Sequence, residues 1–182
     1  MFILYAIPLG IVAGYLSGGR LDGLLALQVR WTPLILVGIV VQLAIFSEPI
    51  DGLVEPAGPA LYMASTTAVL LAVLRNVAIP GMVVVAVGAA SNLAAIAANG
   101  GWMPADALAL ASIGGGGTGY TNSIVVADPA LRPLTDLWAL PAWLPFSNVF
   151  SIGDVLIGAG VAATIALAMR RSSPAPRPGG GS

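Results

Sequence analysis

Two carboxylates, Asp136 and Asp154, are the residues whose types and spacing best suit chemistry. The segment that joins them is short, contains two prolines and carries no charge, so both side chains can reach one site. Two carboxylates held close together cannot both ionise easily, and one of them then keeps a proton. Such a pair can act as base and acid on one water molecule without a metal. Asn92 is a candidate third member of this site.

Several kinds of catalytic chemistry are excluded because the chain lacks the residue types that they need. It has no Cys, no His and no Lys, since all seven of its cations are arginines. Thiol catalysis, histidine general bases, haem ligation by histidine and lysine Schiff bases are therefore excluded. The glycine run 114–117 lacks the Lys of a phosphate-binding loop, so we interpret it as a flexible loop. We expect no metal, no cofactor and no nucleic-acid partner.

The composition predicts that membrane-spanning helices position these residues. Hydrophobic residues make up 58% of the 182 residues and charged residues 8%, whereas soluble domains carry about 25% charged residues. Five apolar stretches approach the roughly 20 residues that cross a bilayer. We therefore expect an all-α fold, a polytopic transmembrane helix bundle with spans near 2–16, 31–47, 60–74, 77–98 and 152–169.

Small residues at four-residue spacing, such as Gly10 and Gly14, let helices approach closely in lipid. They are compatible with an interface between two copies of the chain. Packing inside one bundle is the interpretation we favour.

The arginines fall mainly on one side of this five-span arrangement, and the acids gather on the other. Because cytoplasmic loops are enriched in Lys and Arg, the arginine side is predicted to be cytoplasmic. The amino terminus is then outside, and the carboxyl terminus inside, a bacterial plasma membrane. We expect residues 1–171 to form one transmembrane domain and residues 172–182 to be a disordered tail or linker. The arginines are Arg20, Arg30, Arg75, Arg170, Arg171 and Arg177, and the acids are Glu48, Asp51, Glu55, Asp106, Asp128 and Asp136.

The predicted outer loop, residues 99–150, is too long for a simple connection between helices. It contains Trp102, Trp138 and Trp143 among prolines, a pattern typical of a segment at the membrane surface. Loops of this kind often carry function, so we expect this one to bind a lipid, a small molecule, a membrane peptide or a partner subunit. The candidate ligand-binding residues are Asn92, Asn99, Asn148 and Ser151.

Two motifs carry a resemblance to a known family. They are Asn-Gly-Gly-Trp-Met-Pro at 99–104 and Asn-Val-Phe-Ser-Ile-Gly-Asp at 148–154. They resemble an uncharacterised family of small bacterial multi-pass membrane proteins, over nearly the whole chain from Met1 to the last span. The resemblance implies a membrane location and no particular activity.

A second, partial resemblance is to lipoprotein signal peptidase, an intramembrane aspartyl protease. The segments 135–137 and 150–154 are similar to the settings of that family's two catalytic aspartates, and 91–93 is similar to its Gly-Asn-Leu motif. The resemblance implies that Asp136 and Asp154 activate water. The chain departs from that family at Ser151, where the family has Asn, and in a long insertion between Asn92 and Asp136.

A purely structural role for Asp154 stays open. Ser151 and Asp154 have the spacing of a capping box, in which the two side chains bond the first turn of a helix. Close approach of the two aspartates would favour an intramembrane aspartyl hydrolase. Wide separation, with Asp154 bonded to the Ser151 backbone, would favour a binding or assembly protein, which is the main prediction. A transporter that uses Asp154 as a proton site is the third alternative.

Overall fold

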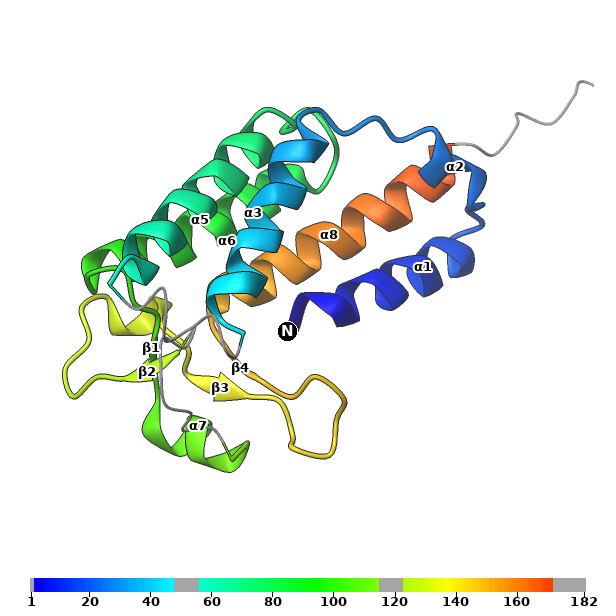
Figure 1. Cartoon of the computed structure of the whole chain (residues 1–182). Helices are drawn as coiled ribbons and strands as arrows, with labels where there is room; N and C mark the ends of the chain where they lie inside the picture. The colour runs from blue at the N-terminus through cyan, green and yellow to red at the C-terminus, as the bar shows by residue number, and fades with distance from the viewer. Residues whose placement is uncertain (1, 48–55, 115–122, 172–182) are drawn as a thin grey trace, which may run out of the picture.

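The fold is a bundle of helices with a small cap at one end (Figure 1). It was obtained as a computed structural model that describes residues 2–47, 56–114 and 123–171. The glycine-rich segment 115–122, the predicted tail 172–182 and the acids Glu48, Asp51 and Glu55 lie outside these residues. Five helices form the bundle: α1 (Ala6–Leu16), α3 (Thr32–Ile45), α5 (Gly58–Leu74), α6 (Met82–Ala98) and α8 (Ile152–Arg171). A 3-10 turn, η1 (Phe2–Tyr5), precedes α1, and a short helix, α2 (Asp22–Leu25), follows it.

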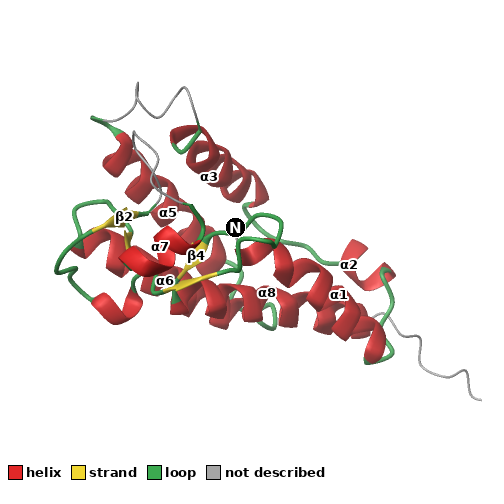
Figure 2. Ribbon diagram, turned by 90° about the horizontal axis from the view of Figure 1, so that it is seen from below, coloured by secondary structure: helices red, strands yellow, loops and turns green. Residues whose placement is uncertain are grey.

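Helix α8 is the centre of the bundle and packs against both α1 and α6. On the other side α5 packs against α6, and α3 packs against α5 (Figure 2). The five helices alternate in direction, so their connections fall at two ends. We call them the cap end, where α8 begins, and the arginine end, where α8 finishes at Arg170 and Arg171.

Two glycines, one on each helix, let α6 and α8 cross at close range. A Cβ atom added at Gly88 would lie 2.9 Å from the backbone nitrogen of Ile157, and one added at Gly160 would lie 2.7 Å from that of Val85. Real Cβ atoms do not approach backbone so closely, so only glycine fits. Gly10 of α1 likewise lies against the backbone of Ala162. These small residues pack within one chain, as favoured from the sequence.

The cap is built from the residues between α6 and α8. Its strand β1 (Pro104–Ala105) pairs in parallel with β2 (Ile124–Val125), and β3 (Trp138–Ala139) pairs antiparallel with β4 (Val149–Phe150). It also contains the short helix α7 (Ala107–Ser112) and the 3-10 turn η2 (Arg132–Leu134). Since η2 contacts both α6 and α8, the cap is seated on the bundle.

The number of membrane spans is not confirmed by helix length. Within the described residues, α8 is the one helix that is both long and apolar enough to cross a bilayer. The other four long helices have 11–17 residues, fewer than the ~20 that a span needs. Helix α6 starts at Met82, later than expected, because Gly81 has a left-handed φ of 93° that ends the preceding turn. The chain is therefore mostly helical with one candidate span.

Candidate functional site at the start of α8

The first turn of α8 closes on itself through Ser151 and Asp154. The backbone nitrogen of Ser151 donates to Oδ2 of Asp154 over 2.9 Å, and the backbone nitrogen of Asp154 donates to Oγ of Ser151 over 3.1 Å. This reciprocal pair is the capping box that the spacing predicted. It satisfies two amide groups that no helical carbonyl can reach, and the carboxylate faces the positive end of the helix dipole.

Asn92 joins this turn from the neighbouring helix. Its Nδ2 donates to Oδ1 of Asp154 over 2.9 Å, and its Oδ1 accepts from Oγ of Ser151 over 2.8 Å. Gly153 makes the contact possible, because a Cβ atom there would overlap the Asn92 amide. The structure thus brings together three residues singled out from the sequence. Both carboxylate oxygens of Asp154 are occupied by these bonds.

Asp136 lies in the cap and is almost completely buried, with 4% of its surface exposed. Its backbone bonds to the strand-β1 segment, since Asp136 N donates to Pro104 O and Asp106 N donates to Asp136 O. The side-chain atom Oδ2 accepts from Oγ of Ser123 over 2.8 Å. Within the described residues, Oδ1 of Asp136 is buried with no hydrogen-bond partner, as is Oγ of Ser91 on α6.

The pKa of Asp136 is raised from 3.8 to about 7, mainly by burial and also by the negative charge of Asp154, while the Ser123 bond opposes the rise. The negative charge of Asp154 favours the protonated form of Asp136. At neutral pH a large fraction of Asp136 carries a proton. A buried carboxyl with a shifted pKa is a recurrent feature of functional sites.

Asn99 and Asn148 lie outside this network. The side chain of Asn99 forms two hydrogen bonds with the backbone of Ala130: Nδ2 donates to Ala130 O over 2.9 Å, and Oδ1 accepts from Ala130 N over 2.9 Å. Its Nδ2 also donates to Ala95 O on α6. The backbone carbonyl of Asn148 accepts from Leu140 N inside the β3–β4 hairpin. Asn99 thus fastens the cap to the end of α6.

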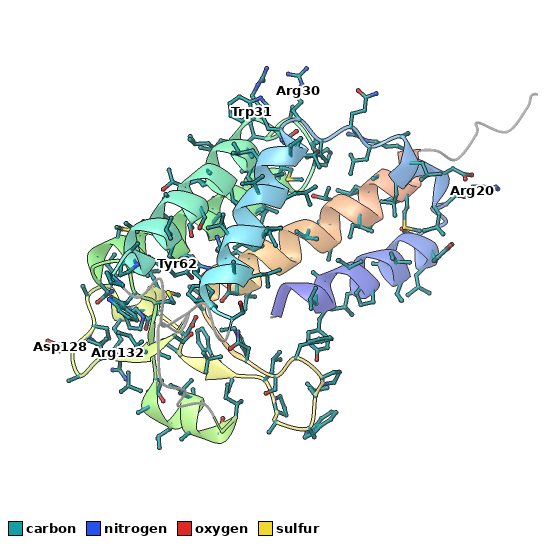
Figure 3. All side chains as sticks on the ribbon, viewed as in Figure 1. Arg20, Arg30, Trp31, Tyr62, Asp128 and Arg132 are labelled. Carbon is teal, nitrogen blue, oxygen red and sulfur yellow. The ribbon has the colours of Figure 1, made fainter. Side chains whose placement is uncertain are left out.

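A hollow of about 390 Å³ opens on the cap, on residues that the sequence analysis did not select as ligands. Its charged members are Asp106, Asp128 and Arg132, and Figure 3 shows Asp128 and Arg132 near each other at the edge of the cap. Asp106 is committed to capping α7, since its carboxylate accepts from the Leu108 and Ala109 amides. In the sequence, Asp128 and Arg132 are an acid and an arginine four residues apart in a loop. This spacing alone does not predict that both side chains lie on one face of the cap.

Comparison with known proteins identifies a family to which the chain is similar. A family model described as a family of unknown function (DUF5317) matches residues 26–166, from before α3 into α8. The match leaves out residues 1–25, so the family resemblance expected from Met1 is found from Ala26 onwards. No curated protein and no solved structure matches the chain. The resemblance to lipoprotein signal peptidase gains no support from these comparisons.

Proposed function

The chain belongs to DUF5317, a family of unknown function, and we propose that it is a multi-pass bacterial plasma-membrane protein that binds a ligand at the outer face through its cap. The amino terminus lies outside and the arginine end in the cytoplasm. The ligand is the zwitterionic headgroup of a membrane lipid. Binding does not require the Asp154 carboxylate, which serves the helix.

The observation that carries a binding role over catalysis is the bonding of Asp154. Oδ1 accepts from Asn92, and Oδ2 accepts from the backbone nitrogen of Ser151. A carboxylate that works as a base must give up its acceptor positions to water or substrate. Here those acceptor positions are occupied by hydrogen bonds that stabilise the first turn of α8 and its contact with α6. The arrangement therefore supports a structural Asp154.

The hollow on the cap supports the choice of ligand. It presents the guanidinium of Arg132 and the carboxylate of Asp128, both on exposed residues. A guanidinium binds phosphate oxygens with paired hydrogen bonds, and a carboxylate binds an ammonium group. A phosphoethanolamine headgroup carries both charges in one small molecule. Its size suits a hollow of this volume.

The proposal is tested by native mass spectrometry of the detergent-solubilised protein with added phosphatidylethanolamine or phosphatidylglycerol. Wild type should retain phosphatidylethanolamine, and Arg132→Gln and Asp128→Asn should each lose it. Arg75→Gln, which changes an exposed arginine at the other end, is the matched control and should behave as wild type. Equal retention by wild type and both cap variants would reject the hollow as the binding site.

An aspartyl hydrolase that acts on membrane peptides is the second candidate, and the pKa of Asp136 favours it. A carboxyl that is half protonated near pH 7 is suited to acid–base catalysis. In this case Asp136→Asn and Asp154→Asn would each abolish cleavage of a membrane peptide while leaving the protein folded. Cleavage that survives Asp154→Asn would exclude a hydrolase that works through the Asp136 and Asp154 pair.

A further inference from the structure

The β3–β4 hairpin, residues 138–150, projects from the cap as a finger beside the start of the chain (Figures 1 and 2). Its base is held by the strand pair and by the bond from Leu140 N to Asn148 O. Near its tip, the hydroxyl of Tyr5 donates to the carbonyl of Pro145. The finger is therefore fixed next to α1, at the cap end of the bundle.

The tip of the finger displays large apolar side chains to the outside. Trp143 is 80% exposed and Phe146 is 64% exposed, the highest values among the large apolar side chains of this hairpin. No charged residue occurs from 137 to 153, so this surface has no charged group for water to hydrate. Phe146 also has a left-handed φ of 58°, which is strained for an aromatic residue. The backbone is thus strained at a position where an aromatic ring is exposed.

The other tryptophans are less exposed than Trp143. Trp102 is half-buried, and Trp138, which stacks on Phe150 with ring centroids 6.0 Å apart, is 45% exposed. At the arginine end, Trp31 is exposed and has a left-handed φ of 60°, like Phe146 (Figure 3). Exposed aromatic residues therefore occur near both ends of a bundle whose 20-residue α8 spans ~30 Å, the thickness of a hydrocarbon core.

We propose that the tip of the finger inserts into the outer-leaflet interface, with Trp143 and Phe146 at the boundary between headgroups and acyl chains. The occupant is lipid, because the exposed apolar face of α1, with Ile7, Leu9 and Val12, continues the surface into the bundle. Aromatic rings prefer this depth of the bilayer. A charge-free tip has no ionic group with which to select a polar partner. This inference rests on the membrane location proposed above.

Tryptophan fluorescence in phospholipid vesicles tests the inference. Trp31, Trp102 and Trp138 are replaced by Phe, which leaves Trp143 as the single fluorophore. In vesicles that contain lipids brominated near the headgroup end of the acyl chain, Trp143 should lose most of its emission, and aqueous acrylamide should quench it little. Two control variants, built with Trp143 also replaced by Phe, each carry one new tryptophan: Val40→Trp on the exposed face of α3 and Ala111→Trp on the exposed surface of α7 in the cap.

The controls separate the two ways in which the experiment can fail. Quenching of Val40→Trp by brominated lipid, without quenching of Trp143, would overturn the finger inference and leave the membrane location standing. Loss of quenching at both positions would reject the membrane location itself. Quenching of Trp143 by acrylamide to the level of Ala111→Trp would place the tip in water, or on a partner protein that is absent from the vesicles, and would also overturn the finger inference.

A second variant covers the case in which the triple replacement does not fold. The chain has no cysteine, so Phe146→Cys gives a single labelling position on the otherwise unchanged protein. A nitroxide attached there should be relaxed by lipid-soluble oxygen more than by an aqueous nickel chelate. The opposite order of accessibility would contradict the inference.

Discussion

Asp136 links the stability of the cap to pH. Its folded pKa of about 7 lies above the unfolded value of 3.8, so the folded state binds the proton more tightly. The contribution of this group is fully present below pH ~4 and is lost as the pH rises through 7. The difference between the two pKa values corresponds to roughly 4 kcal/mol. The thermal unfolding midpoint of the detergent-solubilised protein should therefore be lower at pH 8 than at pH 5.

Asp136→Asn should remove this dependence, because Asn resembles the protonated acid and stays neutral. At pH 8 the variant should melt at a higher temperature than wild type, and the difference should shrink as the pH falls toward 4. Asp128→Asn, which changes an exposed acid of the same cap, is the control and should follow wild type. A wild-type midpoint that does not change with pH would show that Asp136 ionises normally.

Asp154→Asn should be tolerated, although the carboxylate accepts hydrogen bonds from both Asn92 and Ser151. The introduced carboxamide can still accept from the Ser151 backbone with its single oxygen, and its amide can donate to Asn92 once the Asn92 amide turns over. The expected loss is ~1 kcal/mol or less in the free energy of unfolding, mainly from the helix dipole. Chemical denaturation measures it. A loss of several kcal/mol would mean that the charge itself holds the site together.

At the scale of helices, the crossing of α6 and α8 depends on Gly153. A methyl group there would displace the Asn92 amide and break its bonds to Ser151 and Asp154. Gly153→Ala should lower the free energy of unfolding by about 2 kcal/mol, even though Ala favours helix over Gly. Ala159→Leu, on the exposed face of α8, is the control and should have little effect. Equal stabilities of Gly153→Ala and wild type would show that α6 and α8 can separate without cost.

The attachment of the cap to α6 depends on Asn99. Asn99→Ala removes both bonds to the Ala130 peptide, and its expected cost is about 1–2 kcal/mol, confined to the cap. Hydrogen exchange at the Ala130 amide should accelerate, while amides inside α8 should exchange at the wild-type rate. Asn148→Ala serves as the comparison within the same loop. Acceleration throughout α8 would show that the cap and the bundle unfold together.

The parts of the site that sequence reasoning could predict are those fixed by local spacing. Ser151 and Asp154 are three residues apart, which is sufficient to predict a capping box. The pairing of Asn92 with Asp154 followed from placing both near the same end of adjacent helices. The bond between Asp136 and Ser123, and the parallel pairing of β1 with β2, join residues across a glycine-rich segment. Two-residue strands have no periodicity from which to predict them.

At the scale of the whole molecule, hydropathy located the five long helices but not their lengths. The stretch from 31 to 47 became α3, Thr32–Ile45, and the stretch from 152 to 169 became α8, Ile152–Arg171. Apolar side chains form a nearly continuous pattern along these stretches, so the pattern itself cannot mark where a helix ends. Backbone geometry sets the boundaries instead, as at Trp31 and Gly81 with their left-handed φ. The helices alternate in direction along the bundle (Figure 1).

Orientation across the membrane is a prediction that the distribution of charge makes directly testable. Arg20 and Arg30 lie away from the cap in Figure 3, and Arg75, Arg170 and Arg171 end the helices that run toward the same end. Because the chain has no cysteine, single variants report one position each. In spheroplasts, a membrane-impermeant maleimide should label Ala127→Cys on the cap at once, and should label Arg75→Cys only after lysis. Labelling of Arg75→Cys in intact spheroplasts, with Ala127→Cys protected until lysis, would invert the orientation and place the cap and its hollow in the cytoplasm.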